Sequence, residues 1–335
     1  MSNKLKLAEF CAGTGAFSYA FEKKGDVKTV YSNDFDKNSE KIYNENFSIK
    51  MDCKDIHDIE SKKLPDFDIL TSGFPCQPFS VAGKQEGLND ERSDVFYKLI
   101  EIIKEKKPSV VIFENVKNLC NHDKGNTFKV ISKEIDKAGY YFKHKILNTC
   151  VISKIPQNRE RIYIICFKDK TMCDKFKFPK EIKEEKKKKL HKIMEKNIDE
   201  KYYYSDRFKV WSEINEKVKK NISTDTIYQY RRYYVRENKN SVCPTLTANM
   251  GGGGHNVPLI KDNKGIRKLT PRECFNLQGF PKSYKLPDDI SDSGLYKLAG
   301  NAVSVPVVEK VAKRVLKVLK KKTSKKTNKV KETVV

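Results

Sequence analysis

The sequence predicts an α/β fold: a mostly parallel sheet with helices on both faces, together with a small, loop-rich second domain. Through about the first 180 residues, short runs of β-branched and aromatic residues alternate with amphipathic stretches, which is typical of parallel strands joined by helices. After Pro179 a lysine-rich segment leads into a region rich in Tyr, Arg, Asn and Gly that has no steady period. Such a composition indicates a domain dominated by loops.

Strands are expected where a short apolar run is bounded by turn residues. In chain order these runs are Lys4–Phe10, Val27–Asn33, Phe67–Thr71, Ser109–Phe113 and Arg161–Phe167. Amphipathic stretches separate them, so we expect the strands to lie mainly parallel in one sheet.

Three helices are expected from apolar residues at helical spacing. The first ends before Pro108 and carries Val95, Phe96, Leu99, Ile100 and Ile103. The second, which Gly139 is placed to end, carries Phe128, Ile131, Ile135 and Ala138. The third carries Val308, Val311, Ala312, Val315, Leu316 and Leu319. From Lys320 onward the Lys, Thr and Ser residues predict a disordered basic tail.

Charge favours a polyanionic partner. The 335 residues include 68 Lys and Arg against 44 Asp and Glu, a formal net charge of +24, which suits phosphate neutralisation on nucleic acid first and an anionic membrane second. Lysine and asparagine are both abundant, so part of the charge can reflect codon composition. No apolar run approaches the roughly 20 residues of a membrane span, and the N-terminus lacks an apolar signal segment. A cytoplasmic protein that contacts no membrane is expected.

The nine cysteines are an odd number, are widely spread, and include no Cys-x-x-Cys pair. We therefore expect no metal site, and we expect most of these thiols to be reduced and buried.

A glycine-containing turn, Cys11–Phe17, follows the first expected strand and opens an expected helix. Glycine at 13 and 15 lets the backbone approach a nucleotide-like ligand closely. Asp34, 19 positions after Gly15, stands where a carboxylate can accept hydrogen bonds from ribose hydroxyls. The full Gly-x-Gly-x-x-Gly spacing is missing, which argues against NAD, and an ordinary tight turn stays open as the alternative.

Polar groups follow three further strands. Cys76 lies in a Gly- and Pro-rich loop after one strand, where ligands of α/β folds gather, although a structural thiol is the common alternative. Glu114 ends the next strand, where a desolvated carboxyl can hold a proton. Arg159 and Arg161, two positions apart on an extended segment, point the same way and could together hold a base carbonyl and a carboxylate or phosphate.

With these motifs in order, the sequence resembles the bacterial DNA (cytosine-5)-methyltransferase family of type II restriction-modification systems over nearly the whole chain. The resemblance rests on Gly-Phe-Pro-Cys-Gln-Pro-Phe-Ser at 73–80, Glu-Asn-Val at 114–116, Gln-x-Arg-x-Arg at 157–161, Arg267–Cys274, Gln278–Pro281 and Gly300–Val303. It implies a Rossmann-like fold that binds S-adenosylmethionine and releases S-adenosylhomocysteine. It also implies base flipping of a specific cytosine in duplex DNA.

The resemblance assigns roles to four catalytic residues. Cys76 would attack carbon 6 of cytosine, because carbon 5 alone is too weak a nucleophile to take a methyl group. Glu114 would bind ring nitrogen 3 and the exocyclic amine. Arg161 would contact the base carbonyl, and Arg159 would help to order the site. The residues expected to bind the cofactor are Ala12, Gly13, Gly15, Asp34, Phe35, Asp55, Ile56, Pro75, Asn301 and Val303.

Two regions are expected to contact DNA. The loop after Cys76 is suited to closing over the flipped base, and it supplies Ser80, Lys84, Gln85 and Arg92. The second region lies in the small domain, where arginine can read base edges in the major groove. It supplies Arg231, Arg232, Tyr233, Arg236, Thr245, Thr247, Asn249, Gly252 and His255. His255 has no partner at metal-ligand spacing, so a phosphate or backbone contact is favoured for it.

The expected organisation is a catalytic domain at 1–180, a target-recognition domain at 181–280, and a hinge with a returning helix at 281–335. The segment Lys183–Lys201 is either a solvated helix or a linker. We expect a monomer that acts on chromosomal, phage or plasmid DNA, either as the partner of a restriction endonuclease or as an orphan enzyme. Two alternatives stay open: a tRNA cytosine-5 methyltransferase on the same core, and a catalytically silent DNA-binding protein. The recognition sequence does not follow from the residues.

Overall fold

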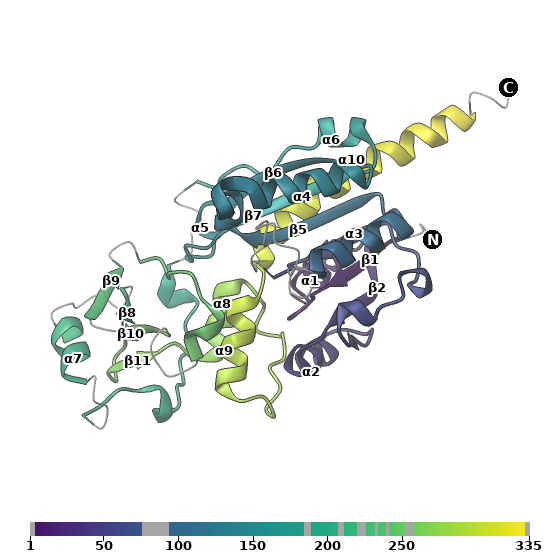
Figure 1. Cartoon of the computed structure of the whole chain (residues 1–335). Coiled ribbons are helices and arrows are strands. Elements are labelled where there is room, and N and C mark those ends of the chain that lie inside the picture. Colours follow the sequence, from purple (N-terminus) through teal and green to yellow (C-terminus); the bar gives the residue numbers. More distant parts are fainter. Residues whose placement is uncertain are drawn as a thin grey trace.

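The computed structural model describes residues 4–75, 94–183, 189–206, 211–219, 226–231, 234–238, 241–251 and 257–331. Within these ranges the strands form a seven-stranded sheet and a separate four-stranded sheet. Figure 1 shows the two sheets side by side, with helices α8 (Pro271–Gln278) and α9 (Asp292–Asn301) between them. None of the helices in the described ranges is both long enough and apolar enough to cross a membrane.

The large sheet is mostly parallel, as predicted. Its order is β3 (Asp52–Cys53), β2 (Val27–Asp34), β1 (Leu5–Phe10), β4 (Ile69–Ser72), β5 (Val110–Val116), β7 (Glu160–Phe167) and β6 (Tyr141–Asn148). The first five strands are parallel, whereas β7 is antiparallel to both β5 and β6. All five expected strands are present. Strand β6 was not predicted, because it is an edge strand in which Leu147 alone is fully buried.

Apolar cores cover both faces of this sheet, which explains the unbroken apolar runs in β5 and β7. Alternate residues of β5 point to opposite faces: Val110 and Ile112 join one core, and Val111 and Phe113 join the other. The first core includes α1 (Ala16–Glu22), α2 (Lys37–Asn46) and α10 (Val305–Lys331). The second includes α3 (Asp94–Lys106) and α4 (Asn126–Lys137). Short helices α5 (Thr149–Ile152) and α6 (Lys170–Lys175) pack beside β6.

The three expected helices are observed as α3, α4 and α10. Gly139 follows α4 with a positive φ of 82°, and its N–H donates to the carbonyl of Asp136 at 2.9 Å, so it ends the helix as predicted. The prediction of disorder from Lys320 was wrong for the backbone, because α10 continues to Lys331. Extending an existing helix costs less than nucleating one.

The small sheet was not predicted as a sheet. It is antiparallel, in the order β11 (Ile266–Lys268), β10 (Pro258–Lys261), β8 (Ile227–Arg231) and β9 (Tyr234–Asn238). Helix α7 (Trp211–Lys219) contributes Ile214 and Val218 to its apolar core. Strands of three to five residues are too short to show a clear alternation in the sequence.

The segment before the small sheet is neither a solvated helix nor a free linker in its described part, from residue 189 onward. Leu190 and Ile193 are buried in the first core of the large sheet, and a short 3-10 helix, η7, spans Leu190–Lys192. The burial of Leu190 and Ile193 therefore fixes this segment against the core, although its many charged residues had predicted that it would be exposed to solvent.

Helix α8 follows the small sheet in the chain and packs in the first core of the large sheet. Thr270 and Glu273 form a capping box at its start. Glu273 is fully buried and accepts hydrogen bonds from both terminal nitrogens of Arg267 at 2.8 Å. The Nε of Arg267 bonds Asp262 at 2.6 Å. This buried charged network joins β11 to α8, and each charge in it is paired.

Candidate active site

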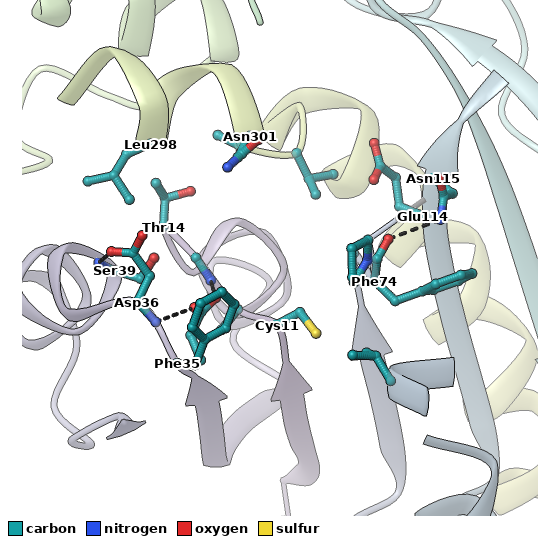
Figure 2. A pocket seen from close by; sticks show the side chains of 18 of the residues that line it. Cys11, Thr14, Phe35, Asp36, Ser39, Phe74, Glu114, Asn115, Leu298 and Asn301 are labelled. Carbon is teal, nitrogen blue, oxygen red and sulfur yellow. Dashed lines mark hydrogen bonds between the residues drawn. The ribbon is translucent and has the colours of Figure 1, made fainter. Parts of the chain in front are cut away.

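A cavity of about 570 Å³ opens at the carboxyl edge of the parallel strands. Its wall combines the loop after β1, the end of β2, the residues after β4, the end of β5 and the last turns of α9. The chain leaves β1 toward β2 on one side, whereas β4 pairs with β1 on the other. Ligands of open α/β sheets bind at such a switch point. Figure 2 shows Phe35 and Cys11 on one side of the cavity and Glu114 on the other.

The loop after β1 is held by the carboxylate of Asp34. Gly13 and Gly15 have φ values of 54° and 67°, in the left-handed region that favours glycine. A Cβ on Gly15 would also lie 2.4 Å from the ring of Phe47. Asp34 accepts the N–H of Gly13 at 2.8 Å and that of Asp36 at 2.9 Å, and burial raises its pKa. Each carboxylate oxygen therefore already holds the backbone, although a second lone pair on each stays available.

A second carboxylate, Glu9, lies beneath the same loop and was not identified from the sequence. It accepts the N–H of Phe17 at 3.2 Å and that of Ser18 at 2.8 Å, and it accepts the Ser18 hydroxyl as well. These donors are at the N-terminus of α1, where a negative charge is favourable. Burial raises the pKa of Glu9 to about 7, against these hydrogen bonds, which lower it.

Phe35 offers a flat apolar surface to the cavity. Its side chain is 76% exposed, which is unusual for a large apolar ring and typical of a ligand contact. Asp55 and Ile56 line the same cavity at the start of the 3-10 helix η1 (Ile56–Asp58). The carboxylate of Asp55 accepts the backbone N–H of His57 at 2.9 Å. The structure thus brings these three expected cofactor residues together.

Helix α9 closes the cavity from the other side. Asn301 and Val303 line it, as do Lys297 and Leu298, which were not predicted. Lys297 Nζ bonds the carboxylate of Asp36 at 2.7 Å, and Asp36 also caps α2 through the N–H of Asn38. This ion pair joins α9 to the start of α2 beside the cavity.

The backbone before Cys76 is fixed from β5. Asn115 Nδ2 donates to the carbonyl of Phe74 at 3.0 Å, and Pro75 lines the cavity. Cys76, Ser80, Lys84, Gln85 and Arg92 lie outside the described residues. The buried Phe74 is therefore held by a hydrogen bond two residues before the position of Cys76.

Glu114 is the buried carboxyl of the cavity. Arg161 Nε lies 3.3 Å from its Oε1, which is an ion-pair distance, although no hydrogen bond to that oxygen is formed within the described residues. Burial raises the pKa of Glu114, and the nearby charges of Arg161 and Arg159 lower it in part. A carboxyl with a raised pKa at the end of a strand can carry a proton toward a base.

The guanidinium group of Arg159 bonds backbone carbonyl groups around the cavity. It donates to the carbonyls of Leu246, Gly300 and Ala302 at 2.9, 3.0 and 2.9 Å. Burial lowers its pKa to about 9, with the repulsion from Arg161 as a further cause. Arg159 and Arg161 both lie near Glu114, but their partners differ, because Arg159 joins three backbone segments around the cavity.

The expected DNA-reading residues are only partly described. Arg232, Tyr233, Gly252 and His255 lie outside the described residues, and only the backbone of Arg231 is described, in β8. Arg236 lies on β9. Thr245 donates its hydroxyl to the carbonyl of Asn158 at 2.6 Å, and Thr247 donates to Asn249 Oδ1 at 2.8 Å. The Thr245 contact and the bond from Arg159 to the carbonyl of Leu246 place this segment next to Arg159, and Thr247 lies against Gly300 of α9.

Comparison with known proteins agrees with this geometry. A family model described as C-5 cytosine-specific DNA methylase matches residues 5–317. The chain is 47% identical over 320 residues to the type II methyltransferase M.Bsp6I of Bacillus sp. (strain RFL6), covering 93% of this chain and 99% of that protein. It is 37% identical to M.HhaI of Haemophilus parahaemolyticus, covering 92% and 93%.

Solved structures agree in fold. The S. pombe Dnmt2 methyltransferase superposes with a TM-score of 0.72 at 20% identity, covering 94% of this chain and 98% of that one. A putative DNA modification methyltransferase from an E. coli prophage gives 0.68 at 18% identity, covering 95% and 100%. The family predicted from the motifs is confirmed: this chain belongs to the C-5 cytosine-specific DNA methylases.

Proposed function

We propose that this DNA (cytosine-5)-methyltransferase acts on one specific cytosine in duplex DNA, with S-adenosylmethionine as the methyl donor and Cys76 as the nucleophile. The observation that carries the proposal is the joint lining of one cavity by a glycine loop, an exposed aromatic ring and a buried carboxyl of raised pKa, Glu114. Cys76 follows Pro75 of that lining directly in sequence.

The cavity fits a nucleoside cofactor in chemistry as well as in size. The exposed ring of Phe35 can stack on a purine, and the glycine backbone after β1 has no Cβ at Gly13 to block approach. Asp55 and Asn301 supply polar groups on the wall. Bound S-adenosylmethionine would supply the methyl group and leave as S-adenosylhomocysteine.

The protein groups would then act on the base. The cytosine must first leave the DNA stack, at a cost of a few kcal/mol. The Cys76 thiolate adds to carbon 6, while Glu114 donates its proton to ring nitrogen 3, so that carbon 5 becomes nucleophilic. Arg161 binds the base carbonyl. After carbon 5 has been methylated, its proton passes to water, the thiolate is eliminated and ring nitrogen 3 returns its proton to Glu114, which restores the aromatic ring and the enzyme.

Different parts of the chain would carry out catalysis and target recognition. We propose that residues 1–180 and the returning segment 281–335 form the catalytic domain, and that 181–280 carries target recognition. We further propose that the protein is a cytoplasmic monomer. The names of the relatives, which are type II methyltransferases, support pairing with a restriction endonuclease.

A Cys76→Ser variant tests the nucleophile. A serine hydroxyl is far less nucleophilic than a thiolate, so methyl transfer from tritiated S-adenosylmethionine to duplex DNA should fall below detection. Binding of S-adenosylhomocysteine should persist, which shows that the variant folds. Normal turnover by the variant would reject Cys76.

The substrate and the covalent step need separate measurements. The same assay with tRNA in place of duplex DNA decides between the two nucleic acids, and label on tRNA alone would overturn the DNA proposal. Bisulfite sequencing of DNA from expressing cells identifies the target. A duplex with 5-fluorocytosine at that position should form a covalent adduct with the wild type and none with Cys76→Ser, since fluorine does not leave as a proton.

A further inference from the structure

An exposed ion pair lies at the rim of the cavity and has no part in the chemistry above. Lys117 directly follows β5, and Glu160 begins β7. These strands are antiparallel, with Val116 opposite Arg161, so both residues lie at the sheet edge that carries Glu114. Lys117 Nζ is 2.5 Å from Glu160 Oε2, and the side chains are 58% and 37% exposed.

Glu160 lies between the two arginines of the site, yet it has a different environment. Arg159 is buried and Arg161 pairs with Glu114, whereas the alternation of an extended chain directs Glu160 away from them. Asn158, on the same side as Glu160, is exposed, and its carbonyl accepts the hydroxyl of Thr245. The rim is therefore a polar, solvent-facing strip that runs from Lys117 toward the small sheet.

We propose that Lys117 is a phosphate-binding residue of the DNA site, and that Glu160 holds its ammonium group until a phosphate of the bound strand replaces the carboxylate. This inference rests on the proposed action on duplex DNA. Lys117 is three residues beyond Glu114, which faces the flipped base, so the phosphates near that base are the ones within its reach.

The exchange is energetically accessible. An exposed lysine–carboxylate pair contributes only about 0–1 kcal/mol, since water screens it and both side chains lose rotamer freedom. A duplex presents a dense row of phosphates, and each lysine that neutralises one of them releases a counterion. Glu160 also opposes DNA by its own charge, so Lys117 and Glu160 should affect DNA affinity in opposite directions.

The test compares Lys117→Gln with Glu160→Gln. Dissociation constants are measured with S-adenosylhomocysteine present, on a duplex that carries the target found by bisulfite sequencing, across a series of salt concentrations. Lys117→Gln should weaken binding by roughly two- to fivefold and reduce the slope of log affinity against log salt by about one. Glu160→Gln should tighten binding.

The control is Lys137→Gln. Lys137 pairs with Glu134 at 2.6 Å and is 53% exposed, which is close to the 58% exposure of Lys117. It lies near the C-terminal end of α4, and the Tyr140 that follows this helix bonds the carbonyl of Pro108, before β5 begins, at the opposite edge of the sheet. This variant should leave DNA affinity unchanged.

The possible results distinguish a failure of the Lys117 proposal from a failure of the proposed function. If Lys117 and Glu160 stabilise the fold only as a pair, both variants lose the same interaction and shift DNA affinity in the same direction, or leave it unchanged. Either result, in an enzyme that still binds and methylates the duplex, overturns the inference alone. A wild type that neither binds nor methylates duplex DNA overturns the proposed function, and the inference with it.

Discussion

Two carboxylates, the half-buried Asp34 and the fully buried Glu9, hold the loop after β1 and the start of α1. Asp34 was predicted as a ribose contact, and it lies on the cavity wall, but its hydrogen bonds in this structure go to the backbone of Gly13 and Asp36. Glu9 holds the start of α1. The sequence motif predicted a carboxylate at the end of the second strand. It could not show which donors that carboxylate bonds, because these depend on how the backbone of the neighbouring loop folds.

Glu9 should make the stability of the protein depend on pH. Its pKa rises from 4.5 to about 7 in the fold, so the folded state holds this proton more tightly than the unfolded chain does. The contribution is fully present below about pH 4.5 and is lost as the pH rises through 7, on the order of 3 kcal/mol in the free energy of unfolding.

A Glu9→Gln variant tests this dependence by denaturant unfolding between pH 5 and 8.5. At pH 5 the folded state holds Glu9 as the neutral acid, whose two oxygens can both accept hydrogen bonds, whereas the amide nitrogen of glutamine cannot accept one. The variant should therefore be less stable than the wild type at pH 5. The difference should shrink toward pH 8.5, because the variant does not carry the cost of a buried charge. Stability curves that stay parallel over this range would show that Glu9 does not titrate there.

At the scale of elements, α9 links the cavity to the segment expected to read DNA. Its C-terminal end carries Asn301, and Gly300 and Ala302 offer their carbonyls to Arg159. The same end packs against η9 (Ala248–Gly251). A Cβ on Gly300 would lie 2.2 Å from the carbonyl carbon of Thr247. Two backbones meet at this point, and only glycine permits the approach.

Gly300→Ala should therefore weaken both stability and cofactor binding. Either α9 or the segment at Thr247 must move, which by analogy with overpacked cores costs about 1–3 kcal/mol, and the movement displaces Asn301 at the cavity wall. Calorimetric titration with S-adenosylhomocysteine and thermal unfolding measure the two effects.

Gly294→Ala is the matched control in the same helix. The three atoms nearest to a Cβ there belong to the side chains of Ile290, Asn38 and Ser291 and not to a backbone, so a smaller adjustment is needed than at Gly300, and alanine favours a helix by up to about 1 kcal/mol. We expect little change or a gain in stability. Equal behaviour of the two variants would mean that the approach at Gly300 has no special role.

The elements differ in how far the sequence could predict them. Strands β5 and β7 carry long apolar runs because both of their faces are covered, and β1, β2 and β4 carry shorter apolar runs between polar residues. Such runs are visible without a structure. Strand β6 is at an edge, and β8 to β11 have only three to five residues each, so their local patterns are weak. The residues of the site also differ in how far the sequence could predict them. Glu114 and Asp34 stand at strand ends, whereas Lys297 and Asp36 pair across 261 residues.

For the whole molecule, the link between the two sheets passes through buried polar groups. Gln157 donates to the carbonyl of Leu277 and to Gln278, and Cys243 exchanges backbone hydrogen bonds with Pro156 and Asn158. Arg159 adds the carbonyl of Leu246. The segment that leaves the small sheet is thus tied to the strand that carries Arg161. A shift in the recognition region on DNA would reach the base pocket through these bonds.

The net charge of +24 leads to a prediction about the molecule as a whole. If the excess of lysine and arginine serves DNA binding, neutralising each phosphate releases counterions, and log affinity should fall with log salt by about 0.9 for each phosphate contact. Six or more contacts correspond to a loss of roughly a thousandfold between about 50 and 200 mM salt. Affinity for S-adenosylhomocysteine, measured in the same buffers, should change little, because the cavity that would hold it is partly enclosed and salt screens buried interactions weakly. A flat response for DNA would mean that the charge reflects the lysine-rich composition of the chain. A steep response for both ligands would instead indicate that salt acts on the fold.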